Sequence, residues 1–235
     1  MKELTTTAHV ERISPLTDSI IELVLAPDTY IDYEAGQYLQ ISSGKELLSY
    51  SIANAPLGSH KYELHIRHDK TNPYNEALFA HIKEFGRVTI HLPLGDCHIN
   101  KLQPNVPIVF IAGGTGFAPI KAMIEQLLAT GDSRSFELYW GARSQSDLYM
   151  DEKVRHWQAH VSHFRYFSLL PNSNPKEKLS TRVISEHKGQ LKDYQFVIGG
   201  PFDMVYATRD ALVAEGVSPS QLYSDAFGFE EKRKE

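Results

Sequence analysis

Hydrophobic and polar positions alternate in short runs along the first hundred residues. The runs at 38–41 and 62–67 alternate with a period of two, and strand-like apolar runs also stand at 19–25 and 88–92. Glycine, asparagine and proline separate these runs, as in short strands joined by tight turns. Closely spaced short strands predict a small antiparallel barrel, which a helix predicted at 76–85 would close.

After Pro107 the pattern changes. Residues 108–112 form an uninterrupted apolar run, typical of a strand that is buried on both faces. Strand-like and helix-like segments then alternate, which predicts a parallel sheet of βαβ units. Further strands are expected at 136–140, 164–169, 196–198 and 221–224, and helices at 119–129, 146–160, 180–187 and 202–215. The predicted fold class is β + α/β, with an antiparallel barrel domain at 1–103 and a parallel-sheet α/β domain at 104–235.

The first buried strand ends in a glycine-rich turn made of Gly113, Gly114, Thr115 and Gly116, and Pro119 opens the predicted helix. Glycine lets the backbone take a positive φ and approach a ligand closely. Proline at the first helical position sacrifices no hydrogen bond. The free N–H groups at a helix start attract phosphate, so the turn favours a nucleotide diphosphate as ligand.

The turn fits the dinucleotide fingerprint only in part. Proline stands at the third glycine position, and Gly141-Ala142-Arg143 stands where the second strand would end in a ribose-binding carboxylate. A plain tight turn between a strand and a helix therefore remains an alternative at this point.

Composition and charge exclude several classes of function. The net charge is −5 without a long basic run, so no nucleic-acid-binding patch is visible. No apolar stretch reaches the roughly 20 residues that span a bilayer, and no secretory pattern opens the chain. We therefore expect a cytoplasmic protein that binds neither nucleic acid nor membrane.

The residue types that hold metals and clusters are poorly placed. Cys97 is the single cysteine, whereas a cysteine-held iron–sulfur cluster needs about four. His156, His160 and His163 have helical spacing, but no carboxylate pattern such as H-E-x-x-H accompanies them. We predict no metal site, and any redox centre would be organic or supplied by a partner.

Seven short motifs follow one another along nearly the whole chain. They are 35–38 (AGQY), 49–53 (SYSIA), 64–66 (LHI), 111–119 (IAGGTGFAP), 139–143 (YWGAR), 199–201 (GGP) and 225–229 (DAFGF). With these motifs in this order, the chain resembles the ferredoxin–NADP reductase superfamily and, within it, the short NAD(P)H:flavin oxidoreductases. The resemblance implies an N-terminal flavin-binding barrel and a C-terminal nicotinamide domain.

The resemblance also implies a flavin site on the barrel. Tyr50 would cover the flavin ring, and Ser51 would be the catalytic residue, with its hydroxyl beside flavin N5. The other implied flavin contacts are Ser49, Ile52, His65, Ile66 and Arg67. Without the other motifs, Tyr50 and Ser51 would be read simply as alternating strand residues. Leu48 stands where the family has an arginine that reaches the flavin phosphate, which favours a dissociable FAD or FMN, although Arg67 or Lys70 could substitute.

On the nicotinamide side, the resemblance implies that the glycine turn and Arg143 hold the dinucleotide phosphates. The residues implied around the nicotinamide are Gly199, Gly200, Pro201, Phe202 and Phe227, the last near the flavin. Many relatives have cysteine where this chain has Gly199, which would leave backbone and space there. Because no acidic residue precedes Asp147 after the second strand, we predict that NADH and NADPH both work, with kcat/KM values within about a hundredfold.

Three functions are open on the sequence. The first is an NAD(P)H-dependent flavin reductase that passes a hydride to FMN, FAD or riboflavin. The second is a flavoprotein component that keeps its flavin and passes electrons to an oxygenase or another acceptor protein. The third is a non-catalytic nucleotide-binding module in which Leu48 marks lost flavin binding. Retention of Tyr50 and Ser51 argues against the third.

Overall fold

A computed structural model describes residues 3–44, 46–68, 72–171 and 178–230. The chain forms two compact units, residues 1–100 with 121–131 and residues 101–120 with 132–235. Helix α2 (Phe117–Thr130) thus contributes its first turn to the second unit and its remainder to the first. A single domain boundary at residue 103 stays a prediction.

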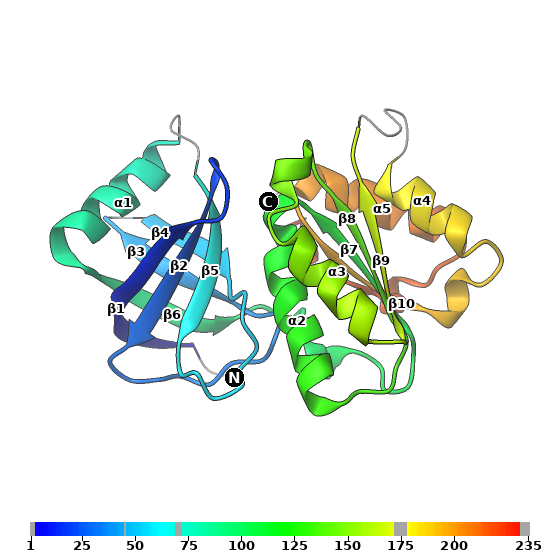
Figure 1. Cartoon of the computed structure of the whole chain (residues 1–235), viewed down its shortest axis with the longest axis horizontal. Coiled ribbons are helices and arrows are strands. Elements are labelled where there is room, and N and C mark those ends of the chain that lie inside the picture. Colours follow the sequence, from blue (N-terminus) through cyan, green and yellow to red (C-terminus); the bar gives the residue numbers. More distant parts are fainter. Residues whose placement is uncertain (1–2, 45, 69–71, 172–177, 231–235) are drawn as a thin grey trace. The chain divides into compact units, whose positions relative to one another are not determined.

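The first unit is built on a six-stranded antiparallel sheet in the order β4-β3-β6-β1-β2-β5 (Figure 1). Its strands are β1 (Leu4–Pro15), β2 (Ile20–Pro27), β3 (Tyr38–Ser43), β4 (Glu46–Ser51), β5 (Tyr62–Arg67) and β6 (Arg87–Leu94). The sheet curls until its two outermost strands meet at one bridge, between Ile52 and Leu64. The antiparallel barrel predicted from the sequence is confirmed as a half-barrel.

Helix α1 (Pro73–Phe85) is set by local signals at both ends. The Asn72 side chain accepts a hydrogen bond from the Tyr74 amide, and Pro73 occupies the first turn. Gly86, with a φ of +64°, ends the helix. Between these signals the helix buries Leu78 and Ile82 in the hydrophobic cluster that fills the half-barrel.

The second unit contains a five-stranded parallel sheet in the order β11-β10-β7-β8-β9. Its strands are β7 (Ile108–Gly113), β8 (Phe136–Gly141), β9 (Phe164–Leu169), β10 (Gln195–Gly199) and β11 (Leu222–Tyr223). Besides α2, its helices are α3 (Asp151–His160), α4 (Leu179–Glu186), α5 (Phe202–Ala214) and α6 (Phe227–Glu230). The predicted parallel-sheet α/β architecture is confirmed.

The strand order of this sheet reverses at β7. The chain runs outward from β7 through β8 to β9 and then returns to the other side of β7 with β10 and β11. In open parallel sheets, ligands bind outside the carboxyl ends of the strands at such a reversal. The carboxyl ends of β7 and β10 are therefore the place to look for a nucleotide site.

Two elements differ from the sequence-based expectation. Residues 4–15 form the long central strand β1, which the sequence pattern does not predict. Helix α3 begins at Asp151 rather than at 146, because residues 145–147 form a separate 3₁₀ turn in which the Ser144 hydroxyl donates to Asp147. Among the described residues, none of the helices combines the length and the apolar character needed to cross a bilayer.

Candidate cofactor sites in the two units

The glycine turn lies at the strand-order reversal of the second unit. Gly114, with a φ of +55°, opens a 3₁₀ turn that leads directly into α2. The Trp140 indole donates a hydrogen bond of 3.0 Å to the Gly114 carbonyl and stacks on Phe117 with ring centroids 4.0 Å apart. Trp140 is fully buried, so it packs and holds the turn from within. The turn itself is partly exposed, as a phosphate-binding loop must be.

The turn after β7 and the end of β10 meet backbone to backbone. A Cβ atom at Gly116 would collide with the carbonyl group of Gly199. A Cβ atom at Gly199 would in turn lie 2.5 Å from the Gly116 carbonyl oxygen. Both positions need glycine in this arrangement. The sequence-based expectation of free space at Gly199 is thus modified, because the backbone of Gly116 fills the direction in which a side chain would point.

Met204 is a further residue at this site, outside all seven sequence motifs. It lies in the first turn of α5, next to the same strand ends. A Cβ atom at Gly113 would lie 2.8 Å from the Met204 sulfur, and one at Gly200 would lie 2.7 Å from its methyl carbon. Gly200 also has a φ of +147°. The thioether therefore covers the small backbone surface that Gly113 and Gly200 leave open. Its position three residues after Pro201 is the sequence signal that could have indicated it.

The segment directly after β8 stands where dinucleotide-binding folds bind the ribose, and it contains several polar side chains. Arg143 is exposed and has neither an ion pair nor a hydrogen bond among the described residues. The Ser144 hydroxyl donates to Asp147 at 3.0 Å, and the Gln145 amide donates to Asp151 at 3.3 Å. Arg143 is thus available to an anion, whereas the neighbouring donors already bind carboxylates.

Phe202 and Phe227 both lie in the second unit. The Arg209 guanidinium stands 5.7 Å from the Phe227 ring and 5.1 Å from the Tyr206 ring. The Tyr206 hydroxyl donates a hydrogen bond of 2.8 Å to the Ala226 carbonyl. This bond attaches the residue before α6 to α5. Phe202 is exposed and lies with its ring 5.7 Å from that of Phe229. Contact of these rings with a cofactor stays a prediction.

Strand β4 presents different residues on its two faces. Leu48 and Tyr50 stand opposite Ile41 and Leu39 of β3 and pack against the hydrophobic cluster of the half-barrel. Ser51 alternates with them. Its side chain is partly exposed, and its hydroxyl has no hydrogen-bond partner among the described residues. Such a hydroxyl is free to donate to a ligand atom.

The other serine of this strand, Ser49, has a partner. Its hydroxyl accepts a hydrogen bond of 3.1 Å from Gln40 on the adjacent strand β3. Of the two β4 serines that the family resemblance implies, only Ser51 therefore has its hydroxyl unengaged within the described part of the chain.

Tyr50 connects β4 to α1 and β5. Its hydroxyl donates to the Asn75 Oδ1 at 3.5 Å, and the Asn75 amide donates to the Arg67 carbonyl at 2.8 Å. Burial raises the pKa of Tyr50 to about 12, so the phenol stays protonated. Leu48 offers no charge in this region, and Lys70 lies outside the described residues. Arg67 is the cation of this group that the structure describes, at the end of β5.

The edges of β4 and β5 are open next to their single bridge. In the described part of the chain β4 pairs otherwise only with β3, and β5 only with β2. Open strand edges carry main-chain donors and acceptors that no other strand uses. Ile52 and Ile66, both implied as flavin contacts, are buried, so their side chains lie in the core and only their backbone can serve a ligand.

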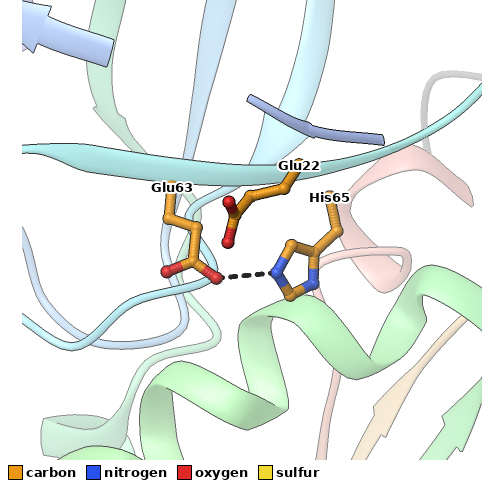
Figure 2. A group of neighbouring side chains, drawn as sticks. All are labelled: Glu22, Glu63 and His65. Carbon is orange, nitrogen blue, oxygen red and sulfur yellow. Dashed lines mark hydrogen bonds and ion pairs between the residues drawn. The ribbon is translucent and has the colours of Figure 1, made fainter. Parts of the chain in front are cut away.

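His65 belongs to a buried polar group beneath β5, shown with Glu22 and Glu63 in Figure 2. Its Nε2 lies 2.8 Å from the Glu63 carboxylate. Burial lowers the pKa of His65, and Glu63 offsets this only in part, so the ring is neutral and donates. Burial by itself would raise the pKa of Glu63, but the hydrogen bond from His65 and the charge of Lys121 lower it to about 2.

The atoms of Glu22, Glu63 and His65 approach one another within 4.8 Å, as metal ligands do. Their charges are already balanced by protein groups. Lys121 lies 3.2 Å from Glu63, and Arg12 lies 2.7 Å from Glu22. A buried ammonium group beside the carboxylate opposes a bound cation, so the group is an ion-pair network.

The sequence is similar to those of several reductases. Residues 110–210 match the oxidoreductase NAD-binding domain family. The chain is 31% identical over 215 residues to the CDP-6-deoxy-L-threo-D-glycero-4-hexulose-3-dehydrase reductase of Yersinia pestis, covering 89% of this chain and 64% of that protein. It is 30% identical to the terephthalate 1,2-dioxygenase reductase component 1 of a Comamonas species, covering 96% of this chain and 68% of that protein. The chain thus spans about two thirds of the length of these relatives.

A further relative matches over its whole length. The NAD(P)H-flavin reductase of Vibrio harveyi is 27% identical over 237 residues, which cover 96% of this chain and 100% of that protein. Among solved structures, a cytochrome P450 reductase from Amycolatopsis superposes with a TM-score of 0.80 at 25% identity. That alignment covers 95% of this chain and 69% of the other.

Proposed function

The chain belongs to the ferredoxin–NADP reductase superfamily, and on this basis we propose that it is an NAD(P)H:flavin oxidoreductase. Its substrates are NADH or NADPH and a flavin, FMN, FAD or riboflavin. The observation that carries the proposal is the direct contact of Gly116 with Gly199 at the strand-order reversal, because it joins the glycine turn to the end of β10 at the place where open parallel sheets bind nucleotides. When both were bound, the nicotinamide would supply a hydride and the flavin would accept it, and this chain would hold and orient the two.

On the nicotinamide side, the residues of this chain bind and orient. The glycine turn offers its backbone N–H groups at the start of α2 to the diphosphate. Arg143 adds a guanidinium that no described residue engages. Gly199, Gly200 and Pro201 would border the nicotinamide, and the small size of the two glycines would favour the close approach that hydride transfer requires.

On the flavin side, Ser51 holds the accepting atom. Its partly exposed hydroxyl has no other partner among the described residues and can donate to N5 or accept from it as the protonation of N5 changes. Tyr50 would meet the flavin ring with the part of its side chain that the hydrophobic cluster leaves exposed. The open edges of β4 and β5 supply main-chain groups to the polar rim of the ring.

The flavin is held by its ring more than by its phosphate. Leu48 stands where the family has an arginine that binds the flavin phosphate. Loss of such a charge-assisted hydrogen bond costs roughly 1.5–3 kcal/mol of binding free energy, or about ten- to a hundredfold in affinity. A flavin bound this way dissociates between turnovers and behaves as a substrate. Steady oxidation of NADH with free FMN, FAD or riboflavin tests the function, and absence of turnover with all three would refute it.

A second function is favoured by the names of two relatives. One is the reductase component of a dioxygenase and another the reductase of a dehydrase, and both are longer than this chain. In this alternative, the flavin stays bound and its electrons pass to a separate acceptor protein. A yellow purified protein that reduces such an acceptor but not free flavin would favour it over the first proposal.

A further inference from the structure

Lys121 of α2 is a buried cation outside the two candidate cofactor sites described above. Its side chain is 2% exposed, and α2 contributes it to the first unit. The ammonium nitrogen lies 3.0 Å from Glu125, 3.2 Å from Glu63 and 2.9 Å from the carbonyl oxygen of Ala53. A buried ammonium is costly unless several acceptors surround it, and here two carboxylates and a carbonyl do so.

The carbonyl that Lys121 binds lies two residues after Ser51. Ala53 is held on its other side as well, because its amide donates 2.7 Å to the Glu63 carbonyl. The amide of Ala55 donates to the other Glu125 oxygen at 3.4 Å. The segment that follows Ser51 is therefore tied to β5 and α2 at Ala53 and to α2 again at Ala55. Lys121 and the two carboxylates that it pairs with take part in both attachments.

His65 completes this arrangement. Its neutral ring donates to Glu63 Oε1 (Figure 2). The same oxygen lies 3.2 Å from the Lys121 ammonium nitrogen. The hydrogen bond keeps the Glu63 carboxylate ionised and oriented, so that the ammonium stays paired at the position from which it reaches Ala53.

We propose that Lys121 is a positioning residue for the Ser51 site. By holding the Ala53 carbonyl, it fixes the end of β4 and with it the direction of the Ser51 hydroxyl toward flavin N5. The inference rests on the proposed function, and it assigns to Lys121 an effect on hydride transfer rather than on the binding of either substrate.

The test compares Lys121→Met, which keeps the length of the side chain but removes its charge, with Lys121→Arg and with the exposed control Lys83→Met. We expect kcat with saturating NADH and flavin to fall at least tenfold in Lys121→Met, with the NADH KM and the flavin Kd changed less than threefold. Lys121→Arg should recover kcat to within threefold of wild type, and Lys83→Met should not differ from it. An unchanged kcat in Lys121→Met would overturn the inference.

A second readout needs no flavin. Amide hydrogen exchange in the peptide that contains Ala53 and Ala55 should be at least tenfold faster in Lys121→Met than in wild type or Lys83→Met. Unchanged exchange in this peptide would also overturn the inference. If Lys121→Met does not fold, Glu63→Gln replaces it, with the same expected losses and the same contradicting results. If the wild-type protein oxidises no NADH with any flavin, the proposed function is refuted. The hydrogen-exchange measurement needs no flavin and would still test whether Lys121 holds the segment at Ala53.

Discussion

Among individual residues, the proposed flavin site depends on which serine hydroxyls are already hydrogen-bonded within the protein and which can bind a ligand. Ser51 has an unpartnered hydroxyl among the described residues, whereas Ser49 is bound by Gln40. The sequence alone could not distinguish the two serines, because both stand in the same motif. It also could not identify Lys121, since a lysine in an apolar helical stretch is expected to extend its charge into water.

Ser51→Ala should slow hydride transfer more than it weakens the binding of NADH. The hydroxyl is proposed to touch flavin N5 and not the dinucleotide, so its loss is felt in the transition state. We expect kcat to fall at least tenfold, about 1.4 kcal/mol, in steady-state assays. Ser43→Ala, on the adjacent strand β3, is the control and should keep kcat within threefold. A raised NADH KM with an unchanged kcat would exclude this role for Ser51.

Asp147 changes the expectation for cofactor choice. The Ser144 hydroxyl and the Gln145 amide, which would be the donors for a 2′-phosphate, point to the carboxylates of Asp147 and Asp151. We therefore expect both cofactors to work, with NADH preferred by up to about a hundredfold in kcat/KM.

Asp147→Asn should narrow that preference about fivefold, because removal of one nearby charge is worth roughly 1 kcal/mol at a protein surface. Steady-state assays with each cofactor measure the ratio, and the exposed substitution Glu215→Gln is the control. A ratio that is unaffected by Asp147→Asn would mean that another residue reads the 2′-position.

At the element scale, the buried strands were the most predictable part of the fold. The runs at 108–112 and 136–140 correspond within one residue to β7 and β8, because strands buried on both faces are continuously apolar. The missed strand β1 has Leu4 and Ile13 about half exposed and only Ala8 fully buried. Pairing with β2 and β6 on both sides forms this strand, and a local pattern does not report such pairing.

The ion-pair network beneath β5 should make the protein less stable in acid. The pKa of His65 is lowered from 6.5, so below that pH the unfolded chain takes up a proton that the folded chain resists. The pKa of Glu63 is lowered from 4.5 to about 2, so a second loss follows between those values. Each proton costs at most about 1.4 kcal/mol of unfolding free energy per pH unit.

Urea unfolding at pH 7, 5.5, 4 and 3 measures this dependence. His65→Gln should flatten the loss of stability that begins below pH 6.5, and Glu63→Gln the further loss below pH 4.5. The exposed substitution Glu84→Gln should leave the wild-type dependence in place. Identical pH dependence in all four proteins would contradict the assigned charge states.

For the whole molecule, the two-part architecture could be predicted from the change of hydrophobic pattern after Pro107. The family could be predicted from the seven motifs in their order. The close contact of Gly116 with Gly199 could not be predicted, because it joins segments more than 80 residues apart that only the strand order brings together. The match over the full length of a flavin reductase from Vibrio harveyi agrees with a chain that combines the barrel and the nicotinamide unit.

The central claim is that this chain passes a hydride from a nicotinamide cofactor to a flavin. The most direct measurement is the visible absorbance of added FMN, FAD or riboflavin after NADH is supplied without oxygen. We expect catalytic amounts of the protein to bleach the flavin band with one flavin reduced per NADH oxidised, and Ser51→Ala to slow this at least tenfold. A flavin band that persists with every flavin, while the protein still binds NADH, would refute the proposed hydride transfer.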